Sequence, residues 1–496
     1  MWWKKFVLMI AICSSFVYNQ SIADTTSYLK IRSNLIQSDQ RFRMAFEEKT
    51  ELEQHAEKVL SELKMKYLTL PSHLFPPANL FYENKAEYDQ MKLLEIMEKL
   101  PKGGMLHAHL FAISDYKTMI EDTYDPKAWF YVGENNGDIP YGALSWQKNS
   151  PGENWVNIVE LRKDCGNPDS LDTAIHNWIT IDLEDYAKGD IWVEFENCWS
   201  RIWRFVNCPD NREKYIYEEL KTLAEEKATY AEFRTYVGPL EYNNGKTLST
   251  EEVIEQWRRI KKRIQIEYPG FDFRLIATRG RWTPPDVTGD YLKDVAHYIR
   301  DYPDLVVGFD WVGEEDKNRG NIEYLDAWLE ADRYADSIGV DLTPYLHSGE
   351  SNRLDNENLY DAILMDVKRI GHGFALKRHP VVMEEVIEKD ICLEICPLSN
   401  QILGYIRDLR NHPAVDYLVR DVPFVIAPDD PSMLNYTWAH DWVAATLAWD
   451  LSIGEIREII LNSFRYSGLD ESSKEKMIQT WETEWGKFLI WMSDME

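Results

Sequence analysis

The alternation of short strands with helices over the C-terminal half of the chain constrains its fold more than any other feature. From residue 229 onward, β-rich runs are separated by amphipathic helical stretches, among them 251–268, 289–301, 324–338 and 358–367. The predicted strands are residues 105–109, 230–236, 273–277, 305–311, 341–346, 369–370, 391–395 and 423–426. Strands that alternate with helices form parallel sheets, and eight such units fit a (β/α)8 barrel of the α/β class. A doubly wound open sheet is the competing architecture, but no Gly-x-Gly-x-x-Gly motif follows the first strand to mark a dinucleotide site.

Three other segments differ from this pattern. Residues 24–100 have apolar residues at three- and four-residue spacing among Glu and Lys, and they are predicted to form an N-terminal helical extension before the strand–helix region 101–496. Residues 118–185 are rich in Asn, Gly, Asp, Pro and aromatic residues, which indicates an insertion after the first strand. Residues 192–227 are predicted to form one amphipathic helix.

The first 23 residues have the pattern of a signal peptide. A short basic region is followed by a largely apolar run over 6–17, and Ser21 and Ala23 place small residues where cleavage before Asp24 requires them. No later stretch is long and apolar enough for a membrane span, so the mature chain is predicted to be secreted or periplasmic. The net charge of −29 argues against nucleic acid or anionic lipid as a partner.

Removal of the signal peptide leaves five cysteines in the mature chain, namely Cys165, Cys198, Cys208, Cys392 and Cys396. An odd number leaves at least one free thiol. Cys392 and Cys396 lie in an apolar run and are predicted to be buried as small hydrophobic residues. Cys198 and Cys208 are a candidate disulfide in an exported protein.

Polar residues stand at the C-terminal ends of the predicted strands, where barrel enzymes place their chemistry. His107 and His109 are two residues apart in the first strand, so their side chains point to the same face. The set at these strand ends is His107, His109, His347, Glu350, His372, Asp429 and Asp430.

These residue types match the needs of a hydrolytic metal site. Three imidazoles and a carboxylate, from His107, His109, His347 and Asp429, are the ligand set of a zinc ion that activates water. Glu350 and His372 are placed to move protons, and Asp430 is placed to hold a substrate. The alternative for Asp429 is a turn or a helix N-cap.

A series of motifs in the chain resembles the adenosine deaminase superfamily. They begin at Lys102, Gly308, His347, Arg369, Glu394, Asp408 and Asp429 and read KGGMLHAH, GFDWVGEED, HSGE, RIGHGFAL, EICPLSNQ, DLRNHP and DDP. The order of these motifs and the segments at both ends are similar to the secreted branch of the superfamily, the adenosine deaminase-related growth factors or type 2 adenosine deaminases. The resemblance covers nearly all of the mature chain.

The resemblance implies a barrel with one zinc ion per chain, bound by the four residues named above, that hydrolyses adenosine or 2′-deoxyadenosine to inosine and ammonia. Glu350 would protonate ring nitrogen N1, and His372 would orient and deprotonate the attacking water. Asp430 would bind on the N7 or water side, and the backbone N–H of Gly313 would meet N3. Trp192 matches a tryptophan that covers the substrate. The extension would form a homodimer, and the insertion would bind a cell-surface receptor or a glycan.

The chain departs from the family pattern at the sugar end. Leu110 and Phe111 stand where relatives carry Asp, and Gly280 stands where secreted relatives carry His. Two alternatives to an adenosine deaminase therefore stay open. One is a zinc amidohydrolase of the same fold that acts on another amino-purine or amino-heterocycle. The other is an extracellular growth-factor-like binding protein in which catalysis is secondary. Cys165 also lacks a partner in the insertion for the disulfide that the resemblance implies.

Overall fold

The computed structural model describes residues 24–40, 50–134, 139–242 and 245–495. The predicted signal peptide, residues 1–23, lies outside the described residues. Within those ranges, none of the helices has the length and apolar character needed to cross a membrane.

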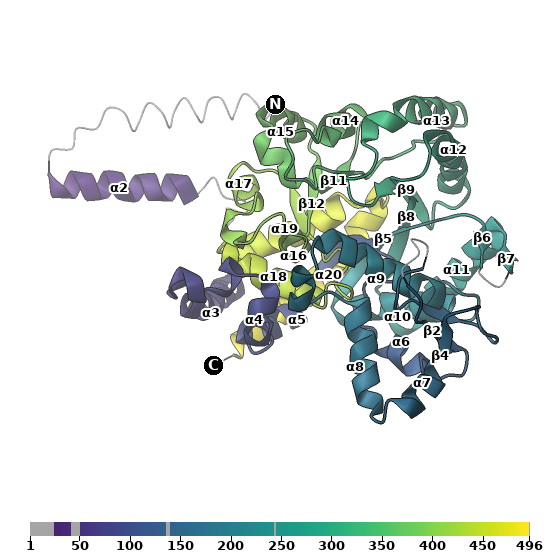
Figure 1. Cartoon of the computed structure of the whole chain (residues 1–496). Helices are drawn as coiled ribbons and strands as arrows, with labels where there is room; N and C mark the ends of the chain where they lie inside the picture. The colour runs from purple at the N-terminus through teal and green to yellow at the C-terminus, as the bar shows by residue number, and fades with distance from the viewer. Residues whose placement is uncertain (1–23, 41–49, 135–138, 243–244, 496) are drawn as a thin grey trace.

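Two four-stranded parallel sheets form the centre of the molecule (Figure 1). The first has the order β1-β5-β8-β9, with β1 (Gly103–His109), β5 (Ala228–Thr235), β8 (Asp272–Gly280) and β9 (Val306–Val312). The second has the order β10-β11-β12-β13, with β10 (His347–Ser348), β11 (Arg369–His372), β12 (Cys392–Ile395) and β13 (Phe424–Ile426). All six pairings within the sheets are parallel, so the predicted α/β class is confirmed.

Isolated parallel bridges join the two sheets at both of their edges. Phe309 of β9 pairs with Pro344, which precedes β10, and Ala108 of β1 pairs with Asp429, which follows β13. The ends of the first and last strands are therefore neighbours in space, although they lie far apart in sequence.

Helices follow most of the strands and bury one face each against them. They are α11 (Thr250–Glu267), α12 (Pro285–Asp301), η4 (Asn321–Tyr324), α13 (Leu325–Ser337), α14 (Asn358–Leu364), η5 (Phe374–Arg378), α15 (Pro380–Glu388), α16 (Pro397–Ile402), η6 (Leu409–Asn411), α17 (Ala414–Val419), α18 (Trp438–Ala448), α19 (Ile453–Arg465) and α20 (Glu471–Ser493). In α11, Val253, Trp257, Ile260 and Ile264 repeat at helical spacing and are buried. Ser249 caps the start of α11 in a capping box with Glu252.

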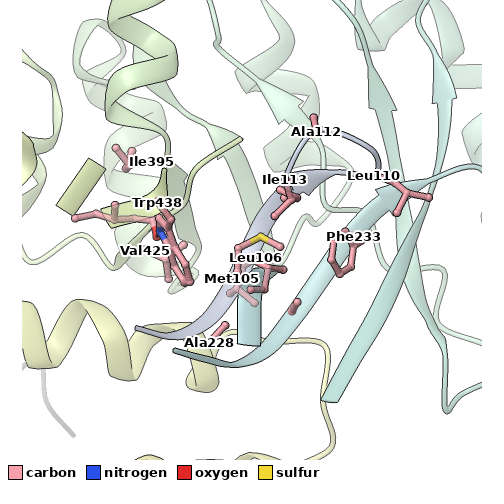
Figure 2. Close-up of a cluster of buried hydrophobic side chains, with 14 of the residues drawn as sticks. Met105, Leu106, Leu110, Ala112, Ile113, Ala228, Phe233, Ile395, Val425 and Trp438 are labelled. Carbon is pink, nitrogen blue, oxygen red and sulfur yellow. The ribbon is translucent and has the colours of Figure 1, made fainter. Parts of the chain in front are cut away.

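The core runs continuously beneath the strands. Figure 2 shows Met105 and Leu106 of β1 beside Phe233 of β5, with Val425 of β13 and Trp438 of α18 nearby. All five side chains are almost completely buried. Side chains from the first and last strands thus share one apolar cluster, which holds the polar ends of those strands in a fixed relation.

The segment 24–100 consists of helices in its described part, with α2 (Thr25–Gln40), α3 (Glu51–Leu68), η1 (Ser72–Leu74), η2 (Pro76–Ala78), α4 (Phe81–Tyr88) and α5 (Lys92–Lys99). Helix α3 packs against the C-terminal helix α20. Lys64 of α3 is buried and pairs with Asp450 at 2.7 Å. These contacts attach the extension to the C-terminal part of the chain.

The described residues of the predicted insertion, 118–134 and 139–185, form helices and a small sheet. These elements are α6 (Lys117–Asp122), α7 (Ile158–Asp164), α8 (Pro168–Ile179) and η3 (Leu183–Ala187), with an antiparallel sheet of β2 (Ala128–Tyr131), β3 (Leu144–Trp146) and β4 (Trp155–Asn157). Phe130 and Trp178 pack with ring centroids 4.7 Å apart. Strands of three or four residues are too short to show periodicity in the sequence.

Two predicted elements were wrong in their bounds. The single helix over 192–227 is two helices, α9 (Ile191–Val206) and α10 (Arg212–Glu225), because Pro209 has no N–H and disfavours a helical residue before it. The predicted strand 341–346 makes only the bridge at Pro344, and β10 begins at His347. Pro344 cannot donate to a strand ladder.

A short hairpin of β6 (Leu240–Glu241) and β7 (Thr247–Leu248) precedes α11.

Candidate active site

Four predicted metal ligands meet at the C-terminal ends of strands from both sheets. The ligand atoms of His107, His109, His347 and Asp429 all lie within 4.8 Å of one another. Nε2 of His107 and Nε2 of His109 are each 3.3 Å from Oδ1 of Asp429. The bridge between Ala108 and Asp429 brings the last of these residues to the first strand.

Unpartnered atoms in this cluster fit a cation. Nε2 of His107 and Oδ1 of Asp429 are buried and have no hydrogen-bond partner among the described residues. A buried polar atom without a partner costs about 1–3 kcal/mol, and coordination would satisfy both atoms. Three imidazole nitrogens and one carboxylate oxygen are a donor set that zinc accepts. A second group, His107, His372, Cys396 and Asp429, is equally close, but burial raises the pKa of the Cys396 thiol well above its usual range, which disfavours the thiolate ligand.

Buried carboxylates fix the orientation of two of the histidines. Nδ1 of His107 is 2.6 Å from Oε2 of Glu394, and Nδ1 of His347 is 2.6 Å from Oδ2 of Asp310. Nδ1–H donates in each pair, which leaves Nε2 free to coordinate a metal. Arg234 links the two carboxylates, because its guanidinium donates to Asp310 at 2.7 Å and to Glu394 at 2.6 Å.

The sequence prediction gave no role to this supporting network. Asp310 and Glu394 lay within the family motifs, and Arg234 was not identified at all. The sequence did contain a sign of this network, because Arg234 and Glu394 are charged residues inside apolar strand sequences. Such residues are rarely fully buried unless they are paired.

Glu350 is buried and lies beside the candidate metal ligands. Its backbone N–H donates to Glu315 at 2.9 Å, and its Oε1 lies 3.6 Å from Nδ1 of His372. Burial, and next the negative charges of Asp429 and Glu315, raise the pKa of Glu350 well above its usual range. A protonated carboxyl at neutral pH is what a general acid requires.

A chain of hydrogen bonds fixes the tautomer of His372. The backbone N–H of Ala414 donates to Nδ1 of His412 at 3.1 Å, so the His412 proton sits on Nε2, which is 3.2 Å from Oδ1 of Asn400. The Asn400 amide then donates from Nδ2 to Nδ1 of His372 at 3.1 Å. His372 therefore carries its proton on Nε2, which lies 3.9 Å from Oδ2 of Asp429.

The neutral state of His412 predicts a pH-dependent stability. Burial lowers the pKa of His412 to about 3, whereas an unperturbed histidine titrates near 6.5. Between these two values the unfolded chain binds a proton that the folded chain does not, so the free energy of unfolding falls as the pH drops below about 6.5. The expected slope is up to about 1.4 kcal/mol per pH unit for this group. Denaturant unfolding across this pH range measures it.

The variant His412→Asn should remove this contribution. The slope of its free energy of unfolding against pH should fall by the amount that one bound proton contributes. The exposed His73, replaced by Asn, is the matched control and should leave the slope unchanged. Equal slopes in the wild type and His412→Asn would contradict the assignment.

One cavity of about 590 Å³ opens onto the four candidate metal ligands. Its lining includes every predicted site residue except His107, namely Trp192, Gly313, His109, His347, Glu350, His372, Asp429 and Asp430. Gly313 has φ of 105°, and a Cβ there would lie 2.8 Å from Trp282. Only glycine therefore adopts this backbone conformation in the cavity wall without strain. Leu110, Phe111 and Gly280, the departures from the family pattern, also line the cavity.

The candidate disulfide between Cys198 and Cys208 is absent, and all five cysteines of the described chain are free. Cys198 lies within α9, and Cys208 follows the end of that helix. A helix that rises 1.5 Å per residue places the two roughly 12 Å or more apart along its axis, which exceeds the Cα separation of about 7 Å that a disulfide can span.

Comparison with known proteins identifies the family. The adenosine deaminase family model matches residues 159–483. The chain is 30% identical to adenosine deaminase 2-A of Danio rerio, covering 87% of this chain and 88% of that protein. It is 28% identical to adenosine deaminase 2 of Dictyostelium discoideum, covering 83% of this chain and 77% of that protein.

Solved structures agree at the level of the fold. The Arabidopsis N6-mAMP deaminase superposes with a TM-score of 0.57 at 18% identity, covering 78% of this chain and 99% of that one. An amidohydrolase from Burkholderia ambifaria with bound zinc gives a TM-score of 0.55 at 16% identity, covering 81% and 95%. From the family match over most of its length, the chain belongs to the adenosine deaminase family.

Proposed function

We propose that this protein is an exported zinc-dependent deaminase that converts adenosine or 2′-deoxyadenosine to inosine and ammonia. The observation that carries the proposal is the meeting of His107, His109, His347 and Asp429 beside Glu350 in the wall of one cavity. Relatives named adenosine deaminase, similar over most of the chain, support the same activity.

One zinc ion per chain would be held by those four residues. The chemistry that zinc supplies in such a site is Lewis acidity, which lowers the pKa of water towards neutrality. The protein keeps Nε2 of His107 and His347 available by holding both Nδ1 atoms on carboxylates. A fixed ring orientation reduces the cost of binding the ion.

Glu350 supplies a proton to ring nitrogen N1 of the purine. Its raised pKa keeps the carboxyl protonated near neutral pH, and protonation at N1 makes C6 a better electrophile. The backbone N–H of Gly313 binds N3, and Asp430 binds on the N7 or water side. Oδ1 of Asp430 is buried without a hydrogen-bond partner, as expected of a group that meets a substrate.

His372 orients the attacking water. In the tautomer fixed by Asn400, its Nε2–H donates a hydrogen bond, which positions a water oxygen for attack on C6. Nε2 does not accept the water proton in this tautomer, so the deprotonating role that the resemblance implies requires Nε2 to lose its own proton first. Trp192 is 8% exposed and stands at the start of α9, where it covers the bound base. Covering the base excludes bulk water from the reacting centre.

The architecture around the site follows the same proposal. The two sheets together form the eight-stranded barrel, a reading that the bridges at Phe309 and Ala108 support. Residues 1–23 direct export, and residues 24–100 form the homodimer contact. The insertion over 118–185 offers a surface for a cell-surface receptor or a glycan.

A second candidate is an amidohydrolase of the same fold that acts on a modified amino-purine. The observation that favours it is the presence of Leu110, Phe111 and Gly280 in the cavity wall, where the family pattern has sugar-binding residues. The two candidates share the metal site and the proton donor, and they differ in the substrate that the rest of the cavity accepts.

An ultraviolet assay on the purified protein tests the proposed function. Addition of adenosine should replace the adenine absorption band by that of hypoxanthine. A chelator should abolish turnover, and zinc should restore it, because the ligand set holds the ion that activates water. Metal analysis should give one zinc per chain. Turnover that persists after zinc has been removed would contradict the proposal.

A further inference from the structure

An arginine without a partner lines the active-site cavity. Arg212 begins α10 and is 2% exposed, and its side chain forms no hydrogen bond or ion pair with the described part of the chain. Its guanidinium lies 5.8 Å from the ring centroids of both Phe111 and Trp257. Its Nε is buried without a hydrogen bond. A buried charge that lacks a counter-ion is costly, which calls for a functional reason.

A second arginine lines the same cavity. Arg279 lies near the end of β8, with its guanidinium 4.6 Å from the ring centroid of Tyr236 and 4.3 Å from that of Tyr291. Its Nε is also buried without a hydrogen bond, and no carboxylate of the described residues lies within ion-pair distance of it. The two aromatic rings hold the guanidinium in place, and its Nε–H is left without an acceptor.

Both arginines adjoin the positions where the chain departs from its secreted relatives. Arg212 lies over the ring of Phe111, and Arg279 directly precedes Gly280. Of the four acidic residues in the cavity lining, three lie at or beside the candidate metal ligands, namely Glu350, Asp429 and Asp430. The fourth is Glu196, and its burial, together with the nearby Glu314, raises its pKa. The lining near Phe111 and Gly280 thus carries two arginines, in a chain whose net charge is −29.

We propose that the preferred substrate is a purine nucleoside with an anionic group on its sugar, such as a phosphate, and that Arg212 and Arg279 bind that group. The inference rests on the proposed deaminase activity and specifies its substrate class. Guanidinium donors match phosphate oxygens in pairs and form stronger hydrogen bonds than neutral donors. An anion at this point would also supply the counter-charge that Arg212 lacks.

The test compares nucleotide with nucleoside on the purified, zinc-loaded protein. We expect kcat/KM for 5′-AMP or 3′-AMP to exceed that for adenosine by about tenfold or more, the size of one charge-assisted hydrogen bond. Arg212→Met and Arg279→Met should each lower this ratio by about tenfold. Arg300→Met is the matched control, since Arg300 is exposed on α12 and pairs with Asp301, and it should leave the ratio unchanged.

Binding and stability give a readout that does not require turnover. IMP should raise the melting temperature of the wild type more than inosine does at the same concentration, and this difference should be lost in Arg212→Met. Without ligand, Arg212→Met should melt at or above the wild-type temperature, because it removes an unpaired buried charge. A purely structural arginine would instead lower the melting temperature when replaced.

The outcomes separate the two proposals. A preference for adenosine that is the same in both variants, with equal shifts from IMP and inosine, overturns the anion site and leaves the deaminase standing. Failure to deaminate nucleoside and nucleotide alike overturns the proposed function, and the IMP shift in the wild type and Arg212→Met then decides the anion site by itself.

Discussion

Replacing Glu350 by glutamine is expected to lower kcat by about 10²–10⁴-fold while leaving the fold and the zinc content intact. Glutamine has nearly the same shape but cannot give a proton to the purine ring. Glu350 lies outside the proposed ligand set, and its backbone N–H contact with Glu315 does not depend on its side chain. Turnover by ultraviolet absorbance, zinc by metal analysis and the melting temperature together measure the effect.

The matched control for this change is Glu330→Gln on α13, where the carboxylate is exposed and pairs with Lys293 on the surface. Its kcat should equal that of the wild type. Near-normal turnover by Glu350→Gln, or a loss that is fully explained by missing zinc, would show that the role given to Glu350 is wrong.

The largest effect on stability is expected at Arg234. Its change to methionine should reduce the free energy of unfolding by about 3–5 kcal/mol, because it leaves Asp310 and Glu394 as buried carboxylates that have lost a shared counter-charge. The same change should weaken zinc binding by about 10–100-fold, because those carboxylates orient His347 and His107. Denaturant unfolding and zinc titration against a competing chelator measure the two losses.

Arg258 provides the comparison, because it forms an ion pair with Asp304 on the surface. Arg258→Met should cost less than about 1 kcal/mol and leave zinc affinity unchanged. A cost at Arg234 as small as at Arg258 would mean that the buried network contributes little to either property.

The site was more predictable than the structure that supports it. Each proposed metal ligand stands at the end of an apolar strand sequence, so local pattern was enough to propose His107 or Asp429. The role of Arg234 depends on which strands are neighbours, since Asp310 and Glu394 come from β9 and β12, in different sheets. Strand order is a property of the whole fold and leaves no mark in the sequence near any one of these residues.

The predicted boundaries of two elements were wrong because a proline interrupts an apolar sequence pattern. Pro344 ended the expected fifth strand, and Pro209 divided the expected long helix into α9 and α10. That division places Arg212 at the start of its own helix, in the cavity wall. A hydrophobic pattern reports which face of an element is buried, but it does not report where the backbone changes direction.

If the proposed ligand set holds a metal, the pairing of Ala108 with Asp429 determines when the chain is able to take it up. The proposed ligands are separated by more than three hundred residues, and the last of them follows the final strand. A nascent chain emerging from the ribosome holds at most three of the four, so loading has to wait until synthesis is nearly complete. If the protein is exported as proposed, the ion would then be drawn from the compartment in which folding finishes, and the zinc supply there would set the fraction of active molecules.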